Sequence, residues 1–331
     1  MTDGPITVVG AGAIGGFAGA RLLKAGHDVR FVEANRDHVA AIRSGGLRVT
    51  GAVSLHVWPN VLLPHEVGGD IGLVLLAVKA QDTVAALEPI VPALTSDGLV
   101  VSLQNGLEEY RIAAAVGPER TIGASLTFGG HYEAPGTIAY AGPGSFHLGE
   151  LDGSMSGRLE RLATVLSAVH PVEPTTRILA HLWGKTAVGA YYVATALVDA
   201  DVLEILGDDT GLPSLGALVA EVARVAAAEG VVCEPVDGFD PDAFLREDEA
   251  GVRASWDAQR RYWRGLETRR TGVWRDLWLR RRQTEVRAIV APVLERARLH
   301  GVETPGLDRL LVEVEAAEAS TARSRPRRDE H

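Results

Sequence analysis

The sequence contains very little cysteine: Cys233 is the only one among 331 residues. A disulfide within the chain is therefore impossible, and such scarcity is typical of a reducing compartment. Cys233 follows a helical pattern in an apolar stretch, and we interpret it as a small core residue rather than a nucleophile. The chain also lacks an apolar run of about 18 residues, which argues against a transmembrane helix, and a secretory signal pattern. We therefore expect a cytoplasmic protein.

Basic residues are in the minority, with 33 against 43 acidic residues and a net charge of −10, which argues against a general nucleic-acid-binding protein. None of the ten histidines stands in an HxxxH or HxH pair, so we predict no metal site. No GxSxG elbow or cysteine–histidine signature points to hydrolysis. Residues 269–287 are dense in arginine. We interpret them as a solvated helix face, and the alternative is a surface that attracts an anionic substrate.

The N-terminal segment is the most informative part of the chain. An apolar run, Ile6–Val9, leads into the glycine-rich sequence GAGAIG at residues 10–15, and a helical pattern follows to Lys24. A second apolar run, Val29–Val32, ends on the acidic residue Glu33. A strand, a glycine-rich turn, a helix, a strand and an acid, in this order, indicate a dinucleotide-binding fold. A glycine-rich turn in an ordinary α/β domain is the alternative.

Each glycine of this turn has a physical role in a dinucleotide site. Gly10 permits the tight turn, Gly12 lets the backbone approach a pyrophosphate, and Gly15 lets the helix pack closely on the strand. The N–H groups at the helix start, at Ala13 and Ile14, can bind phosphate oxygens, and the helix dipole favours negative charge there. We therefore predict that these five residues bind the cofactor.

The acid at the end of the second strand bears on the choice of cofactor. Glu33 can accept hydrogen bonds from both ribose hydroxyls, and its charge repels a 2′-phosphate. Arg36 can stack on adenine or bind that phosphate, or it can be a solvated residue at a helix start. We expect NAD as the cofactor, with NADP as the alternative.

Strand-like and helix-like segments alternate through the first half of the chain, which predicts a mostly parallel, doubly wound sheet of Rossmann type. The apolar run 70–78 and the segment Leu99–Leu103 are typical of strands covered on both faces. A helix is expected over residues 81–94, broken late by Pro89 and Pro92. The segment 129–149 holds six glycines and two prolines, and we expect it to add antiparallel strands that finish the sheet.

From about Trp183 onward, almost the whole chain shows helical periodicity. The sequence therefore predicts a dinucleotide-binding domain over residues 1–174, an all-α domain over 175–320, and a polar, basic tail over 321–331 that is disordered. The expected helices of the second domain are 182–198, 212–229, 248–266, 280–300 and 306–319.

Two polar residues follow buried strands at the carboxyl edge of the predicted sheet, where ligands of doubly wound folds bind. Lys79 comes directly after the run 70–78, and Asn105 follows Leu99–Leu103. Lys79 is either functional or a solvated strand end. The amide of Asn105 binds the nicotinamide or a substrate oxygen, or it belongs to a common Asn-Gly turn.

A third candidate, Lys185, lies near the start of an otherwise apolar helix, where burial of a charge without a partner is costly. It either extends its ammonium group to solvent or acts as a general acid. Hydride delivery to a carbonyl develops negative charge on oxygen, and an adjacent ammonium group stabilises that charge and donates the proton.

Together these segments resemble the ketopantoate reductase (2-dehydropantoate 2-reductase) family over nearly the whole chain. The segments that resemble its nucleotide-binding half are GAGAIGG from residue 10, IRSGGL from residue 42, VKA from residue 78 and SLQNG from residue 102. Those that resemble its helical half are WGK at residues 183–185, Asp276 with Thr284-Glu285, and GVETP at residues 301–305. The order and spacing of these motifs carry the resemblance.

The resemblance implies a Rossmann-type domain, a helical domain arranged as at the C-terminus of 6-phosphogluconate dehydrogenase, and an active site between them. It implies Lys185 as the proton donor or acceptor for the carbonyl, and Glu285 as a partner that orients the lysine or the substrate. It also implies that Lys79 and Asn105 lie near nicotinamide and substrate, with Asn105 in a catalytic as well as a cofactor-binding role. A homodimer is a further expectation.

The sequence departs from the family at substrate-binding positions. The resemblance implies asparagines four and eight residues after the lysine, where this chain has Gly189 and Val193, and a Ser-Met pair where it has Gly272-Val273. A site that hydrogen-bonds its substrate discriminates strongly, so loss of these groups changes the preferred substrate. The long segment 236–270 carries three aromatic residues that either line a larger apolar pocket or pack an additional helix: Trp256, Tyr262 and Trp263.

We therefore expect an NAD(P)-dependent oxidoreductase that transfers hydride between nicotinamide and a small-molecule carbonyl or secondary alcohol other than ketopantoate, with no nucleic-acid or membrane partner. Three alternatives stay open. They are an authentic 2-dehydropantoate 2-reductase of pantothenate synthesis, an imine reductase, since the same hydride geometry serves a C=N bond, and a regulatory protein that binds NAD(H) without turnover.

Overall fold

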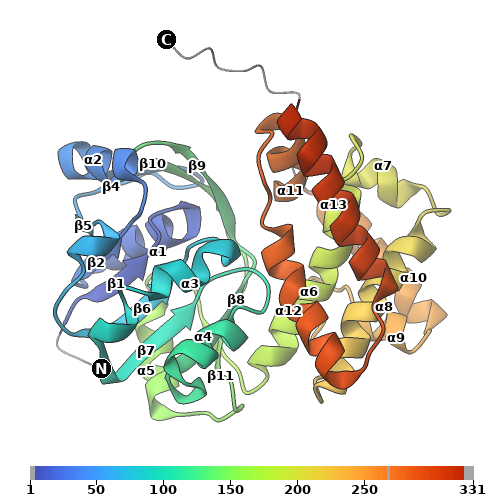
Figure 1. Ribbon diagram of the computed structural model, residues 1–331, viewed down its shortest axis with the longest axis horizontal. Helices are drawn as coiled ribbons and strands as arrows, with labels where there is room; N and C mark the ends of the chain where they lie inside the picture. The colour runs from blue at the N-terminus through green and yellow to red at the C-terminus, as the bar shows by residue number, and fades with distance from the viewer. Residues whose placement is uncertain (1–3, 267–268, 324–331) are drawn as a thin grey trace. The chain divides into compact units, whose positions relative to one another are not determined.

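The computed structural model describes residues 4–266 and 269–323 (Figure 1). The chain separates into two units, of which the first ends at Ile178 and the second begins at Leu179, close to the boundary expected after residue 174. The first unit combines a sheet with helices, and the second is built of helices. Within the described ranges, no helix is both long and apolar enough to cross a membrane.

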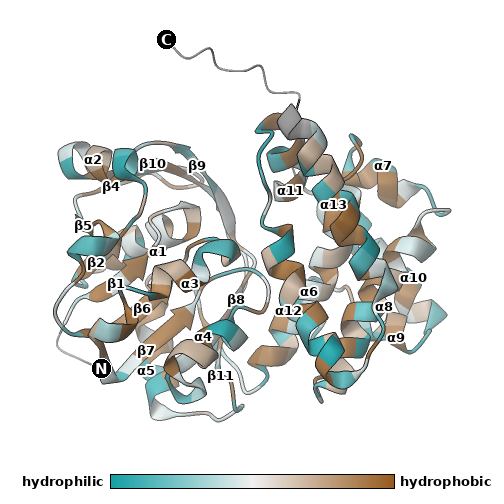
Figure 2. Cartoon of the chain, viewed as in Figure 1, coloured by the Kyte–Doolittle hydropathy of each residue, from teal (hydrophilic) through white to brown (hydrophobic). Residues whose placement is uncertain are grey.

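An eight-stranded sheet forms the centre of the first unit, in the order β12-β11-β8-β7-β6-β1-β2-β5. Its strands are β1 (Ile6–Val9), β2 (Val29–Val32), β5 (Asn60–Leu62), β6 (Ile71–Leu76), β7 (Leu94–Ser102), β8 (Thr121–Leu126), β11 (Phe146–Glu150) and β12 (Glu173–Pro174). The strands from β5 to β8 are parallel and follow the order of a Rossmann fold. The expected doubly wound sheet is therefore confirmed. Figure 2 shows β6 and β7 as mainly hydrophobic, as strands covered on both faces should be.

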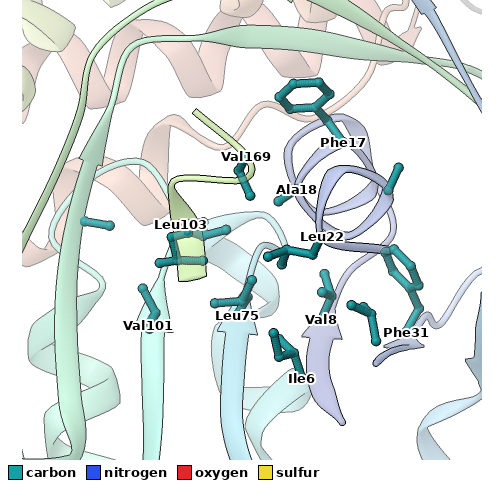
Figure 3. Packing of buried hydrophobic residues seen from close by; sticks show 14 of the residues in the cluster. Ile6, Val8, Phe17, Ala18, Leu22, Phe31, Leu75, Val101, Leu103 and Val169 are labelled. Carbon is teal, nitrogen blue, oxygen red and sulfur yellow. The ribbon is translucent and has the colours of Figure 1, made fainter. Parts of the chain in front are cut away.

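Helices cover this sheet because its strands carry large apolar side chains. They are α1 (Ala13–Lys24), α2 (Arg36–Gly45), α3 (Thr83–Leu87), α4 (Glu109–Val116) and α5 (Gly157–Leu166). Figure 3 shows Leu22 of α1 next to Val8 of β1 and Leu75 of β6, and all three side chains are completely buried. Burial of one such side chain contributes about 1.5–3 kcal/mol. This packing fixes α1, and with it the glycine-rich turn at its start.

The helix expected over residues 81–94 breaks at the prolines, as predicted, but its regular part is short. A 3-10 turn at Ala80–Asp82 leads into α3, and a second 3-10 turn at Val91–Ala93 follows it. The helix ends before Pro89 and Pro92 because proline lacks the N–H group that a continuing helix needs and its ring crowds the preceding turn.

A second sheet, in the order β4-β3-β10-β9, corrects another expectation. Its strands are β3 (Leu47–Gly51), β4 (Leu55–Val57), β9 (Gly129–Ala134) and β10 (Thr137–Gly142). Only β11 of the segment 129–149 joins the main sheet, while β10 pairs with β3. The reason is apolar burial on α1: Tyr140 of β10 stacks on Phe17 with ring centroids 3.9 Å apart, and Ile138 packs on Gly16.

The second unit contains the five helices that the sequence predicts, as α6, α8, α10, α12 and α13, together with shorter ones. Their bounds are α6 (Ile178–Thr195), α7 (Val202–Gly207), α8 (Leu212–Ala228), α9 (Pro241–Leu245), α10 (Glu249–Arg264), α11 (Gly272–Trp274), α12 (Val286–His300) and α13 (Pro305–Arg323). Helix α12 begins later than expected because the backbone turns at Arg281, where φ is +47°. Helix α13 runs three residues into the expected tail, and residues 324–331 lie outside the described ranges.

Candidate functional site

The glycine-rich turn between β1 and α1 has the geometry that a pyrophosphate requires. Gly10 has φ +95°, and a Cβ there would lie 3.0 Å from the backbone of Ala77 and Val78. A Cβ at Gly15 would lie 2.1 Å from the carbonyl oxygen of Gly10. A Cβ at Gly12, in contrast, would meet nothing within 4 Å, and no side chain caps the N-terminus of α1. This open, side-chain-free backbone beside an uncapped helix start fits a dinucleotide phosphate group.

The carboxylate of Glu33 lies against this turn. Its Oε2 accepts a hydrogen bond from the Ala11 N–H group at 2.8 Å, and its Oε1 accepts one from the Asn35 N–H group at 2.8 Å. Two lone pairs on each oxygen leave further capacity for hydroxyl donors. Arg36 is exposed at the start of α2. The carboxylate is therefore held against the backbone of the turn, with acceptor capacity to spare.

His38 connects this region to the second sheet, and the sequence analysis missed it. The side chain is 1% exposed. Its Nδ1 accepts a hydrogen bond from the Gly136 N–H group at 2.8 Å, and its Nε2 lies 2.9 Å from the carbonyl oxygen of Ala11. The first contact assigns the neutral ring with its proton on Nε2, which donates to Ala11. A lone histidine in a helical pattern gives no signal of contacts this distant in sequence.

Lys79 and Asn105 lie at the same carboxyl edge of the sheet as the turn, after β6 and β7, as expected. Gln104 ties their two loops together, because its Nε2 donates to the carbonyl oxygen of Val78 at 3.0 Å and to Thr83 Oγ1 at 2.8 Å. Lys79 is half-buried and Asn105 is exposed. The buried Oε1 of Gln104 has no hydrogen-bond partner among the residues described, which leaves an acceptor at this edge.

In the second unit, one face of α6 is partly exposed. It consists of residues spaced by four, four and three: His181, Lys185, Gly189 and Tyr192. A Cβ at Gly189 would meet nothing within 4 Å, so the space one turn beyond Lys185 is open. Val193, the other departure from the family pattern, is buried instead.

The helix is held tightly next to this lysine. A Cβ at Gly184 would lie 2.1 Å from the carbonyl oxygen of Glu234, and the Glu234 N–H group donates to the carbonyl oxygen of Ala180 at 3.0 Å. Trp183 is completely buried. The WGK motif therefore combines an anchor, a close backbone contact and a half-buried cation within three residues.

Tyr192 shares the face of Lys185 but is not a rival proton donor. The hydroxyl groups of Tyr191 and Tyr192 both donate to Gln259 Oε1, at 2.6 and 2.8 Å. Burial raises the pKa of Tyr192 well above its ordinary value. Its proton is committed to Gln259, so Lys185 is the better candidate on this face for a proton transfer.

The aromatic residues of the long segment have different environments. Trp256 packs edge-on against Tyr191 with centroids 5.2 Å apart, Trp263 packs against Tyr192 at 5.2 Å, and both tryptophans are buried. They pack an additional helix, α10, as one of the two interpretations predicts. Tyr262 is partly exposed.

The two acidic residues that the family resemblance singles out in the helical unit, Asp276 and Glu285, lie before α12. Asp276 is buried and accepts hydrogen bonds from Arg280 at 3.0 Å and Arg282 at 2.9 Å. The N–H and hydroxyl groups of Thr284 both donate to Glu318 at 2.7 Å, which anchors the residue that precedes Glu285. Glu285 is half-buried directly before α12. Several arginines of the region are therefore engaged in ion pairs rather than spread over a helix face.

Cys233 is buried, as expected. Burial raises the pKa of its thiol, and the nearby charge of Asp242 adds to this effect. A thiol that stays protonated is a poor nucleophile, so its environment is that of a core residue.

Comparisons with known proteins agree with this geometry. The family model described as ketopantoate reductase PanE/ApbA matches residues 6–153, and the model of its C-terminal part matches residues 177–318. A 2-dehydropantoate 2-reductase of Archaeoglobus fulgidus is 32% identical over 239 residues, which cover 72% of this chain and 76% of that protein. A 2-dehydropantoate 2-reductase of Mesorhizobium japonicum is 29% identical over 337 residues, covering 92% and 95%.

A solved structure supports the same fold. The complex of D-mandelate dehydrogenase with NADH and anilino(oxo)acetate is similar to this chain with a TM-score of 0.81 at 24% identity, covering 96% of this chain and 100% of that one. The two family models together span most of the sequence, including the turn at residues 10–15 and the WGK motif. The chain therefore belongs to the ketopantoate reductase family of NAD(P)-dependent oxidoreductases.

Proposed function

We propose that this protein uses NAD(H) to interconvert a carbonyl compound and its secondary alcohol, with Lys185 as the general acid and base, on a substrate bulkier and less polar than ketopantoate. One observation carries the proposal: Lys185 shares the partly exposed face of α6 with Gly189, where the helix leaves open space in place of a side chain.

We assign the binding of the cofactor to residues of the first unit. The turn from Gly10 to Gly15 binds the pyrophosphate through backbone N–H groups, and Glu33 binds the ribose hydroxyls. The same carboxylate repels a 2′-phosphate, which favours NAD over NADP. When bound, the nicotinamide supplies or accepts the hydride. Lys79 and Asn105 follow the neighbouring strands, on the side of β1 opposite to Glu33, and we assign them to the nicotinamide end.

We assign the proton transfer to residues of the second unit. The ammonium group of Lys185 stabilises the negative charge that develops on the carbonyl oxygen during reduction and gives it a proton, and the neutral amine takes that proton in the reverse direction. Glu285 orients the lysine or the substrate. Anchoring of Thr284 by Glu318 and of α6 by Gly184 keeps both groups on rigid elements.

Two glycines support a substrate other than ketopantoate. A Cβ at Gly189 would meet nothing within 4 Å, and one at Gly272 would first meet a guanidinium nitrogen of Arg275 at 4.0 Å. Neither position offers a side-chain hydrogen bond to a substrate hydroxyl. Open space that offers no side-chain hydrogen bond at Gly189 favours an aliphatic or aromatic substituent next to the carbonyl.

The test is oxidation of NADH and of NADPH, followed by absorbance, with ketopantoate and with 2-keto acids and ketones that carry larger aliphatic or aryl groups. Turnover of a bulkier carbonyl with NADH in preference to ketopantoate supports the proposal. Efficient turnover of ketopantoate would support the second candidate, an authentic 2-dehydropantoate 2-reductase, which the names of the curated relatives favour.

A Lys185→Ala variant separates catalysis from regulation. Loss of turnover with NADH binding retained supports the catalytic role of the lysine. Absence of turnover in the parent protein with every carbonyl tested would favour a regulatory protein that binds NAD(H). Cytoplasmic location and pairing into a homodimer stay predictions.

A further inference from the structure

The hairpin of β9 and β10 approaches the glycine-rich turn from the second sheet. A Cβ at Gly130 of β9 would lie 3.2 Å from the Cβ of Ala13, the first residue of α1. Pairing with β10 is regular from Gly130 to Tyr132. Because side chains alternate along a strand, Tyr132 projects from the same face as Gly130. Tyr132 therefore stands on the side of β9 that faces the start of α1.

A contact with α2 defines the position of Tyr132 relative to the glycine-rich turn. Its ring packs edge-on against the ring of His38 with centroids 5.1 Å apart, and His38 in turn contacts the carbonyl oxygen of Ala11 in the turn. Ala11 in turn donates its N–H group to Glu33 Oε2 at 2.8 Å. The ring of Tyr132 is therefore connected through His38 and Ala11 to the carboxylate that we assign to the ribose.

The position along the sheet identifies which half of a dinucleotide lies here. Strand β1 lies between β2, which ends at Glu33, and β6, which leads to Lys79. A pyrophosphate over the turn after β1 directs the adenosine toward β2 and the nicotinamide toward β6. Tyr132 is beside the β2 side of the turn, and its side chain is 38% exposed. An aromatic ring with free surface at this point can stack on a purine.

We propose that Tyr132 forms a wall of the adenosine subsite and stacks on the adenine, so that the second sheet contributes a cofactor-binding residue. This inference rests on the proposed cofactor function and extends it beyond the Rossmann sheet. The hairpin that carries Tyr132 is held in place by His38, which accepts from the N–H group of Gly136 at the hairpin turn and contacts Ala11 on its other side.

The experiment is calorimetric titration of the full chain with three ligands: NADH, ADP-ribose, which keeps the adenosine diphosphate half, and reduced nicotinamide mononucleotide, which lacks it. The variants are Tyr132→Ala, Tyr132→Phe, which keeps the ring, and Tyr132→Leu, which keeps apolar bulk if alanine disturbs the strand. His131→Ala is the matched control, since this neighbour on β9 projects from the opposite face.

We expect Tyr132→Ala and Tyr132→Leu to raise the Kd for NADH and for ADP-ribose roughly five- to tenfold, as the loss of one aromatic stacking contact implies. Tyr132→Phe and His131→Ala retain near-parental affinity, and no variant changes the affinity for the mononucleotide. Unchanged ADP-ribose affinity in Tyr132→Ala, or an equal loss for the mononucleotide, would overturn this inference alone. A parent protein that binds neither NADH nor ADP-ribose would overturn the cofactor assignment as well.

Discussion

Two glycines five residues apart on α6 should respond to the same substitution with opposite signs. At Gly184, a Cβ would lie 2.1 Å from the carbonyl oxygen of Glu234, whereas real Cβ atoms essentially never approach a heavy atom beyond their chain neighbours to within 3.0 Å. The helix and the segment at Glu234 must then separate by at least about 0.9 Å, the difference between these distances. At Gly189, the added Cβ meets nothing within 4 Å.

The magnitudes follow from these distances. Overpacking costs about 1–3 kcal/mol, and contact between a new methyl group and rigid backbone belongs at the upper end. Replacing glycine by alanine inside a helix stabilises the protein by about 1 kcal/mol at most. Gly184→Ala should therefore destabilise the protein by about 2 kcal/mol. Gly189→Ala should stabilise it by about 0.5–1 kcal/mol.

The assay is urea unfolding of the parent and both variants at one temperature, followed by circular dichroism and by tryptophan fluorescence. Trp183 is a convenient reporter because it adjoins Gly184 and is completely buried. Gly184→Ala should also lower kcat, since Lys185 follows directly on the displaced residue. A neutral Gly184→Ala variant, or a Gly189→Ala variant less stable than the parent, would refute the packing described for α6.

Three further predictions concern the cofactor site and the helical unit. Gly12→Ala should leave the melting temperature nearly unchanged but raise the Kd for NADH more than tenfold in calorimetric titration, because the new methyl group enters the open space over the turn. An unchanged Kd would contradict this. Glu33→Gln should shift the ratio of NADPH to NADH affinity toward NADPH, since it removes the charge that repels a 2′-phosphate; an unaltered ratio would count against the ribose assignment. Burial raises the pKa of Glu229, but hydrogen bonds from Arg296 and His300 outweigh it, so the pKa is lowered on folding. The ionised Glu229 therefore stabilises the fold above the ordinary carboxyl pKa, and this stabilisation is lost as pH falls through the lowered pKa of the folded state. Glu229→Gln should make the free energy of unfolding less dependent on pH in this range. Parallel pH profiles of unfolding for the parent and the variant would refute this.

The parts of the fold that sequence reasoning predicts well are those set by local pattern. The segment from Ile6 to Glu33 forms a strand, a glycine-rich turn, a helix and a strand because each glycine meets a short-range steric demand, such as the contact between Gly15 and the carbonyl oxygen of Gly10. The continuous apolar run before Lys79 likewise becomes a strand covered on both faces.

The parts that sequence reasoning misses depend on contacts between distant segments. The alternation in β10 predicts a strand but does not say which sheet it joins, and burial of Tyr140 against Phe17 decides it. The contact of His38 with Gly136 spans 98 residues and has no local signature. Whether Trp256 lines a pocket or packs a helix was open for the same reason, since its contacts with Tyr191, Phe239 and Phe244 are what distinguish the two.

We expect the protein to reduce a carbonyl bulkier than ketopantoate with NADH, with Lys185 as the source of the proton. The most direct test compares kcat/KM of the parent protein for ketopantoate and for 2-keto acids with larger aliphatic or aryl groups, and repeats the best case with Lys185→Ala after NADH binding has been verified. The expected result is a preference for a bulkier substrate and a loss of at least about a hundredfold in kcat for the variant. Efficient turnover of ketopantoate, or an active Lys185→Ala variant, would contradict it.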